Sequence, residues 1–116
     1  MRNQNSKVRV IKRKLSKCKD VCRSYSSLQL AYADKLEAND EVLEFSCNVL
    51  LRDLELNGSY TTDFLITMKN GDMSVRECVE RSKIAKPMNL KLLDASRSYW
   101  LHRGIHDWGL VIDDHA

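Results

Sequence analysis

The sequence predicts an α/β fold in which a mixed central sheet packs against helices. Three observations support it. Extended segments separated by Asn-Gly turns indicate an antiparallel meander, a helical pattern precedes this meander, and a second helical pattern is followed by one more apolar strand. Helix, antiparallel strands, helix and strand, in that order, describe an α/β sandwich. With 116 residues, 43% of them apolar, the chain can form one ordinary core.

The first helix is predicted after residue 25. Ser26 or Ser27 can cap it, apolar side chains recur every four residues from Leu28 to Leu36, and the pattern ends near Asn39. This spacing leaves polar positions on the same face, so a polar side chain can be directed inward.

The meander is predicted from runs of β-branched and aromatic residues with turns between them. Asn57-Gly58 and Asn70-Gly71 are the turn signals. The predicted strands cover residues 42–45, 49–56, 60–68 and 74–79.

The second helix is predicted over residues 88–103, because Pro87 favours the first helical position and Gly104 favours a stop. The run 108–112 that follows is almost continuously apolar. Such a run is typical of a buried strand that joins a sheet after a crossover helix.

Two acids flank the last hairpin, Asp63 before the turn and Glu77 after it. A two-residue Asn70-Gly71 loop would place them on opposite faces of the sheet. A three-residue loop, with Gly71 in the left-handed conformation, would pair them directly, about 5 Å apart at Cβ. Paired acids at that distance repel, so this register predicts a divalent cation or a basic group between them. The alternative is a pair of solvated strand acids.

Charge is distributed unevenly. Residues 1–23 hold nine basic residues and one acid, whereas the remainder has a net charge of −5. This division predicts a basic arm over residues 1–23 and a single domain over residues 24–116. A basic arm on an acidic body suits DNA; the alternative is a soluble tail. The expected DNA contacts are Arg9, Lys12, Arg13, Lys14, Lys17 and Lys19.

The four cysteines are expected to be reduced thiols in a cytoplasmic compartment, because the basic N-terminus lacks the apolar run of an export signal. Cys18 and Cys22 have a spacing that can supply two zinc ligands, but no second close pair follows them. No stretch approaches the roughly 20 apolar residues of a membrane span, so no membrane association is expected.

Several of these motifs, taken in order, resemble a known family. They are Asp63-Phe-Leu-Ile66, the Asn-Gly hairpin with Glu77, Lys86-Pro87, Arg97-Ser-Tyr-Trp100, and Asp107-Trp-Gly-Leu-Val111. Together they resemble the PD-(D/E)xK nuclease core, and more narrowly the N-terminal catalytic domain of TnsA-type transposon-end endonucleases. The resemblance covers residues 25–113, and it implies a restriction-endonuclease-like sandwich.

The resemblance also implies an activity, which is hydrolysis of a DNA phosphodiester during transposition. Mg²⁺ or Mn²⁺ would be held by Asp63, Glu77 and the backbone carbonyl of Cys78. Transposition proteins would be partners; the oligomeric state stays open. Transposon-end enzymes of this kind carry a second domain for DNA and partner proteins, so partners here are expected to use the core or the arm.

The sequence departs from the family pattern at two positions. Val79 stands where the family has a lysine that orients the attacking water, and Gln29 stands where it has an acid on the first helix. Gln29 can ligate through its amide oxygen. Lys83 is the best substitute for the lysine, ahead of Arg76 and Lys86, and Glu37 is a second candidate for the helix acid.

Three functional hypotheses follow. The first is an active metal-dependent DNA endonuclease with a displaced lysine. The second is a catalytically degenerate nuclease fold that serves as a DNA-binding or transposase-assembly subunit. The third is a protein-interaction domain with no nucleic-acid role. The two altered site positions favour the second over the first.

Overall fold

The computed structural model describes residues 2–3, 9–52 and 60–113 of the chain. Within these ranges it has an α/β fold with one mixed sheet and two α-helices, as the sequence predicts. The elements, in chain order, are β1 (Arg2–Asn3), β2 (Ile11–Arg13), β3 (Cys22–Ser24), α1 (Ser27–Ala38), β4 (Val42–Leu50), β5 (Tyr60–Met68), β6 (Met73–Val79), η1 (Arg81–Lys83), α2 (Pro87–Leu101) and β7 (Asp107–Ile112).

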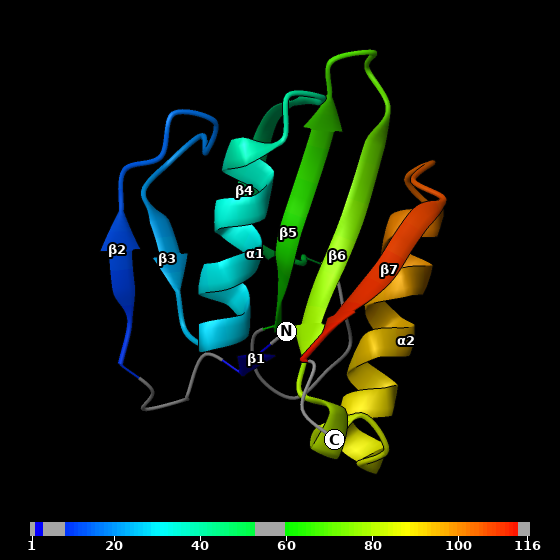
Figure 1. The fold of residues 1–116 in the computed structure, drawn as a ribbon. Coiled ribbons are helices and arrows are strands. Elements are labelled where there is room, and N and C mark those ends of the chain that lie inside the picture. The colour runs from blue at the N-terminus through cyan, green and yellow to red at the C-terminus, as the bar shows by residue number, and fades with distance from the viewer. Residues whose placement is uncertain (1, 4–8, 53–59, 114–116) are drawn as a thin grey trace.

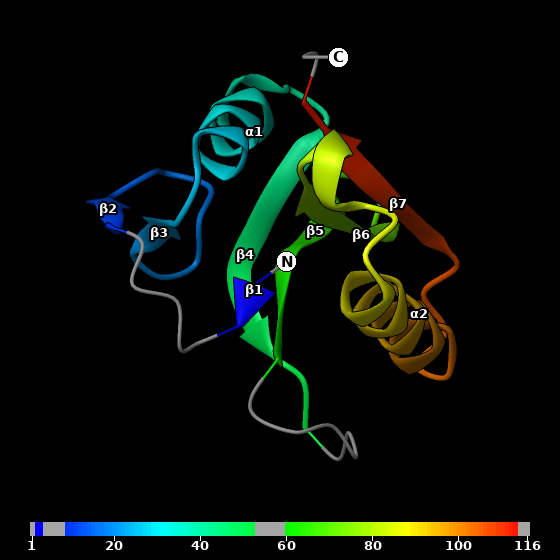
Figure 2. The same cartoon turned by 90° about the horizontal axis from the view of Figure 1, so that it is seen from below.

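The sheet is antiparallel across β4, β5 and β6 and parallel between β6 and β7. The parallel pair follows from α2, which carries the chain back across the sheet before β7 begins. Figure 1 shows this order, and Figure 2 shows α1 and α2 on opposite faces of the sheet. The short hairpin of β2 and β3 lies beside α1.

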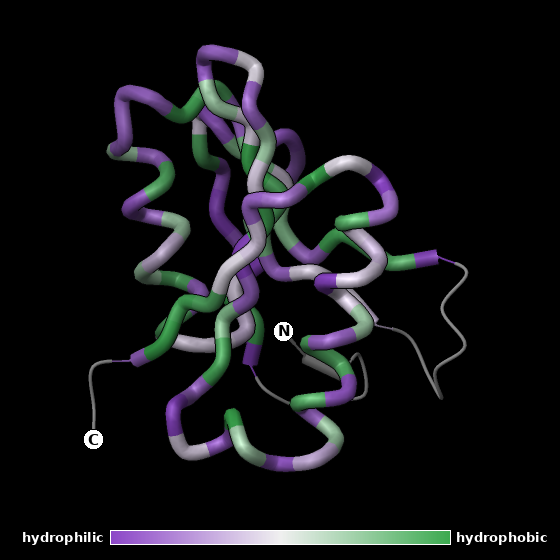
Figure 3. The backbone as a smooth tube through the Cα atoms, turned by 90° about the vertical axis from the view of Figure 1, so that its right-hand side faces the viewer, coloured by the Kyte–Doolittle hydropathy of each residue, from purple (hydrophilic) through white to green (hydrophobic). Residues whose placement is uncertain are grey.

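Helix α1 begins and ends as the sequence predicts, and α2 begins one residue before and ends two residues before its predicted bounds of 88–103. The hydroxyl of Ser26 accepts a hydrogen bond from the backbone N–H of Gln29, which caps α1, and Asn39 follows its last turn. Pro87 occupies the first turn of α2, and Gly104 has a φ of +84° just beyond its end. Figure 3 shows hydrophilic and hydrophobic residues alternating along both helices, as expected when one face packs on a sheet.

Two hydrophobic clusters stabilise the fold, one on each face of the sheet. The first lies under α1 and is centred on Ala33, Leu36, Phe45, Phe64 and Ile66; Cys18 and Cys22 also belong to it. The second lies under α2 and contains Tyr60, Val75, Trp100 and Ile105. Residues 9–23 therefore take part in the core, because their cysteines belong to the first cluster.

The structure corrects two of the predicted strands. The separate strands expected at 42–45 and from 49 onward form one strand, β4, in which Asn48 has a φ of +54°. The expected Asn57-Gly58 turn lies outside the described residues. β7 is half-exposed, although its apolar run predicts a buried strand, because β7 is the last strand in the sheet order. Trp108 packs against the cluster under α2 and Val111 against the cluster under α1, whereas Leu110 is exposed.

Candidate functional site

The hairpin of β5 and β6 has the register that pairs Asp63 with Glu77. Phe64 lies opposite Arg76 and Thr67 lies opposite Met73, so the loop contains three residues. The N–H of Gly71 donates to the carbonyl of Met68 at 2.9 Å, and Gly71 has a φ of +93°. Of the two registers that the sequence allows, the structure therefore has the one with a three-residue loop, in which Asp63 and Glu77 face each other.

The two acids lie where β5 and β6 stop pairing. The antiparallel ladder ends at Phe64 and Arg76, and the first residues of β5 pair with β1 and β4. Beyond that point carboxylates bridge the strands. Glu77 Oε1 accepts the N–H of Asp63 at 2.8 Å, and Asp63 Oδ2 accepts the N–H of Cys78 at 2.6 Å. The acids thus satisfy backbone donors that a longer ladder would have paired.

The second oxygen of Glu77 accepts hydroxyl groups only. Glu77 Oε2 lies 3.2 Å from Tyr60 Oη and 3.0 Å from Thr62 Oγ1, and it accepts from Ser96 Oγ of α2 at 2.5 Å. Two indole groups extend the network, since Trp100 Nε1 donates to Thr62 and Trp108 Nε1 donates to Ser96. We refer to these six residues as the Glu77 network. It connects β5, β6, β7 and α2.

Burial dominates the electrostatics of this network. The side chain of Glu77 has no exposed surface, and burial raises the pKa of its carboxyl group, although the hydroxyl donors oppose the shift. Burial and the nearby Glu77 also raise the pKa of Tyr60, so the phenol stays a neutral donor. The hydrogen-bond donors to the Glu77 side chain are therefore neutral groups, and no positively charged side chain of the described residues is among them.

Asp63 has different partners on the α1 side. Gln29 Nε2 lies 3.3 Å from Asp63 Oδ1 and 2.9 Å from Asn48 Oδ1. The amide oxygen of Gln29 accepts the backbone N–H of Tyr25 at 2.8 Å. Gln29 thus approaches Asp63 with its amide nitrogen, while the oxygen that would ligate a metal is used elsewhere.

The remaining predicted site residues lie on separate surfaces. Val79, at the motif's lysine position, is buried, whereas Lys83 is exposed on η1 and forms an ion pair with Glu80 at 3.3 Å. Lys86 is the N-cap residue of α2. Arg76 pairs with Asp107 at 2.8 Å, across from β6 to β7. Among these groups the structure joins Gln29, Asp63 and Glu77, and it places Lys83 in a surface pair.

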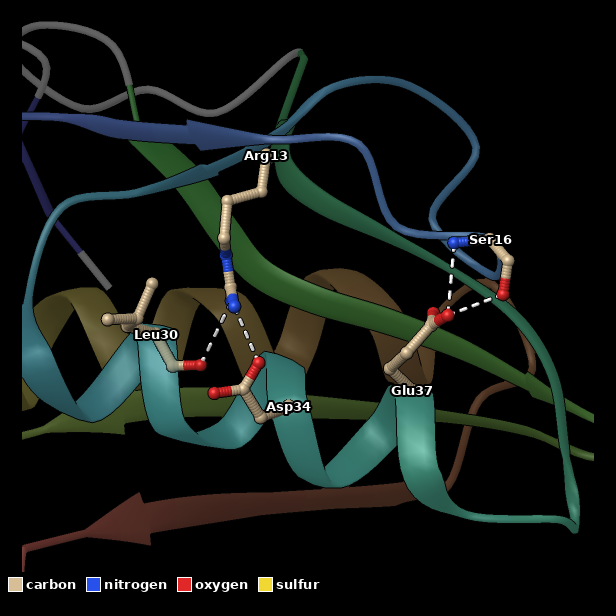
Figure 4. A network of polar contacts seen from close by, with 5 residues as sticks. All are labelled: Arg13, Ser16, Leu30, Asp34 and Glu37. Carbon is tan, nitrogen blue, oxygen red and sulfur yellow. Dashed lines mark hydrogen bonds and ion pairs between the residues drawn. The ribbon is translucent and has the colours of Figure 1, made fainter.

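Glu37, the other candidate for the helix acid, binds the segment that precedes β3. Its carboxylate accepts the hydroxyl and the N–H of Ser16 (Figure 4). It also accepts the N–H of Lys17 at 2.9 Å. These hydrogen bonds, led by the Ser16 hydroxyl, lower the pKa of Glu37. In the same view Arg13 reaches α1, where it contacts the carboxylate of Asp34 at 2.6 Å and the carbonyl oxygen of Leu30.

The six expected DNA contacts divide into two groups. Three hold the fold together or pair with acids, since Arg13 binds Asp34, Lys17 donates to the carbonyl of Asn39, and Lys19 pairs with Glu44. The other three, Arg9, Lys12 and Lys14, are exposed on the β2–β3 side. Within the described residues none of these three is in an ion pair.

Sequence reasoning missed one group of residues. Cys47 of β4 lies beside Cys18 and Cys22, with all three Sγ atoms within 4.8 Å of one another. The Cys18–Cys22 spacing was the available signal, but the third member comes from a distant strand.

No helix in the described ranges is both long and apolar enough to cross a bilayer.

Comparisons with known proteins do not assign the chain to a family. No family model matches the chain, and a search of curated proteins finds no match either.

Proposed function

We propose that the protein is a catalytically degenerate nuclease-like domain that binds DNA, or helps to assemble a transposase on DNA. The observation that carries the proposal is the burial and hydrogen bonding of the Glu77 carboxyl group. Both of its carboxyl oxygens accept hydrogen bonds from the chain itself, and its side chain has no exposed surface. A carboxyl group satisfied in this way needs no cation.

Two further features support degeneracy over catalysis. The ligating oxygen of Gln29 is occupied by the N–H of Tyr25, and Val79 fills the lysine position with an apolar side chain. Metal ligands must be deprotonated, whereas burial raises the pKa of Glu77. The acid pair is therefore proposed to be structural: it satisfies the backbone where β5 and β6 separate.

The DNA part of the proposal is supported by the exposed basic residues of the β2–β3 side. Arg9, Lys12 and Lys14 offer three cations that acids of the described chain do not neutralise. Cations at such positions bind phosphates without reading sequence. We expect affinity for DNA that is general in sequence and sensitive to salt.

Point substitutions test this proposal better than removal of residues 1–23, because Cys18 and Cys22 belong to the hydrophobic core. The test variant combines Lys12→Gln and Lys14→Gln. The matched control combines Lys69→Gln and Lys91→Gln, which are exposed lysines on the hairpin loop and on α2. Fluorescence anisotropy with a labelled DNA duplex at low salt should show roughly tenfold weaker binding for the test variant only. Failure of the wild-type protein to bind DNA at low salt would favour a protein-interaction domain.

An active endonuclease is the second candidate. It is favoured by the hairpin register, which brings Asp63 and Glu77 to facing positions just beyond the last paired residues, and by Gln29 beside Asp63. Mg²⁺ or Mn²⁺ would be held by the two acids and the carbonyl of Cys78, after the hydroxyl groups of the Glu77 network release the carboxylate. Lys83 would have to leave Glu80 to serve as the base. Plasmid cleavage with Mn²⁺ that disappears in both Asp63→Asn and Glu77→Gln would establish this candidate over the first.

A further inference from the structure

Three cysteines from separate parts of the chain converge on one point. Cys18 lies in the turn between β2 and β3, Cys22 is the first residue of β3, and Cys47 lies in β4. Their Sγ atoms all lie within 4.8 Å of one another, and those of Cys18 and Cys47 are 3.9 Å apart. All three thiols are free, so no disulfide accounts for the convergence.

Backbone hydrogen bonds fix this arrangement. The segment before β3 pairs with β4, because the N–H of Phe45 donates to Lys17 at 2.8 Å and the N–H of Lys19 donates to Phe45 at 3.0 Å. Cys18 therefore forms a parallel bridge with Phe45, two residues before Cys47. Cys22 is held by its antiparallel pairing with Arg13. The three sulfur atoms are thus placed by the main chain, which is the preorganisation that a metal site requires.

The pKa values of the three thiols shift in different directions. The hydrogen bond with Cys47, together with burial, raises the pKa of Cys22. Burial raises the pKa of Cys18, but a hydrogen bond from the backbone of Asp20 opposes the shift. The hydrogen bond with Cys22 lowers the pKa of Cys47, and a backbone hydrogen bond from Arg23 acts in the same direction. Without a cation three adjacent thiolates would repel each other strongly, so at most one of them is expected to ionise.

Solvent has access to one side of the cluster. Cys47 is half-buried and lines a surface hollow together with Asp20, Arg23 and Asn48. Cys22 closes the other side within the hydrophobic cluster under α1, and Cys18, also in that cluster, lines a second hollow beside Leu15. An ion can therefore enter from the hollow, and a water molecule in the hollow can supply one further ligand.

We propose that Cys18, Cys22 and Cys47 form a three-thiolate site for Zn²⁺, with a fourth position open to the hollow. Thiolate sulfur is a preferred ligand of zinc, and three protein ligands with one open position satisfy its tetrahedral geometry. Binding would replace the thiol protons, which are released to solvent as the three sulfur atoms bind the ion. Zinc would join β4 to the segment that carries Lys12 and Lys14. This inference is independent of the proposed DNA function.

The binding experiment uses the full chain, reduced and handled without oxygen. After incubation with Zn²⁺ and gel filtration, metal analysis should give about one zinc ion per chain, and X-ray absorption should show three sulfur ligands at about 2.3 Å. Co²⁺ in place of Zn²⁺ should give the intense near-ultraviolet band of thiolate-to-cobalt charge transfer. The absorption measurements need no variant, so they stay decisive if substitutions unfold the protein.

Substitutions then identify the ligands. Cys18→Ser, Cys22→Ser and Cys47→Ser should each lose the retained zinc and the cobalt band. Cys78→Ser is the matched control, because burial raises the pKa of Cys78 to about 12 and its Sγ atom is outside the cluster; it should retain both signals. A reduced wild-type protein that retains no zinc would overturn the proposal, as would zinc bound through nitrogen and oxygen ligands alone. In either case the cysteines would be neutral core thiols.

Discussion

At the scale of single residues, Glu77 is a fully buried acid that joins β5, β6 and α2. Its carboxyl group accepts the backbone N–H of Asp63 and the hydroxyl groups of Tyr60, Thr62 and Ser96. An unsatisfied buried donor costs more than a hydrogen bond gains, so the network is sensitive to small changes in this one side chain.

Glu77→Gln should therefore destabilise the protein by about 1–3 kcal/mol, because an amide group replaces one accepting oxygen with a donor. Urea unfolding at neutral pH, followed by circular dichroism, measures the change. Glu44→Gln is the control, since Glu44 pairs with Lys19 at the surface and its loss should cost less than about 1 kcal/mol. Equal losses in the two variants would contradict a special role for Glu77.

The raised pKa of Glu77 has a consequence for pH dependence. Burial makes the folded protein hold the Glu77 proton more tightly than the unfolded chain does. The resulting stabilisation is complete below the unfolded pKa, about 4.3, and is lost as the pH rises through the folded pKa. The stability difference between wild type and Glu77→Gln should thus be largest near pH 4 and shrink toward alkaline pH. Urea titrations at several pH values test this; a difference that grows with pH would refute it.

The facing positions of Asp63 and Glu77 could be predicted from the sequence, because one hairpin loop and its glycine limit the registers to two. The donors to Glu77 could not, since they come from β5 and from α2, which are joined only by tertiary packing. The same limit applies to Gln29. Its position on the inward face of α1 follows from helical spacing, but the orientation of its amide group depends on hydrogen bonds with Tyr25 and Asn48.

At the scale of elements, the β5–β6 hairpin sets the geometry of the site. Its loop requires a left-handed residue, and Gly71 supplies it with a φ of +93°. The strands of this hairpin were predicted almost to the residue, because an Asn-Gly turn between alternating segments is a strong local signal. β4 and β7 were predicted less well, since continuity past Asn48 and a place at the sheet edge depend on neighbouring strands.

Gly71→Ala should destabilise the protein by about 1 kcal/mol. A methyl group there meets no atom within 4 Å, so the cost is that of the backbone conformation alone. Gly109→Ala in β7 is the matched control; its methyl group would contact Arg76 at an ordinary 3.5 Å, and the change should stay within about 0.5 kcal/mol. Thermal unfolding of both variants gives the comparison. No loss in Gly71→Ala would mean that the loop can adopt another turn.

At the scale of the whole molecule, the basic segment belongs structurally to the body of the protein. The sequence predicts an arm over residues 1–23, but the described part of that segment is built into the fold. β1 pairs with β5, and Arg13 and Glu37 join the β2–β3 segment to α1. The composition of the segment predicts its charge but not its contacts. Those contacts involve residues far along the chain, because Cys18 and Cys22 lie beside Cys47 and Arg13 pairs with Asp34.

DNA binding by Arg9, Lys12 and Lys14 on the β2–β3 side should depend on salt concentration, in proportion to the number of phosphates contacted. The logarithm of the binding constant should fall linearly with the logarithm of salt concentration, by about 0.9 for each contact. The variant that combines Lys12→Gln and Lys14→Gln should reduce that slope by about 2. Anisotropy titrations over a series of salt concentrations measure both slopes, and an unchanged slope would exclude these lysines from the DNA contact.

The protein also carries an optical reporter of its own acid site. Trp100 and Trp108 are its two tryptophans, and the indole N–H of each is bonded to a hydroxyl group that itself donates to Glu77. Their emission should therefore change when a divalent cation draws the Glu77 carboxylate away from those hydroxyls. Zinc held by the cysteines on the α1 side should leave the same spectrum nearly unaltered. Ordinary fluorescence can thus distinguish which of the two sites a ligand has occupied.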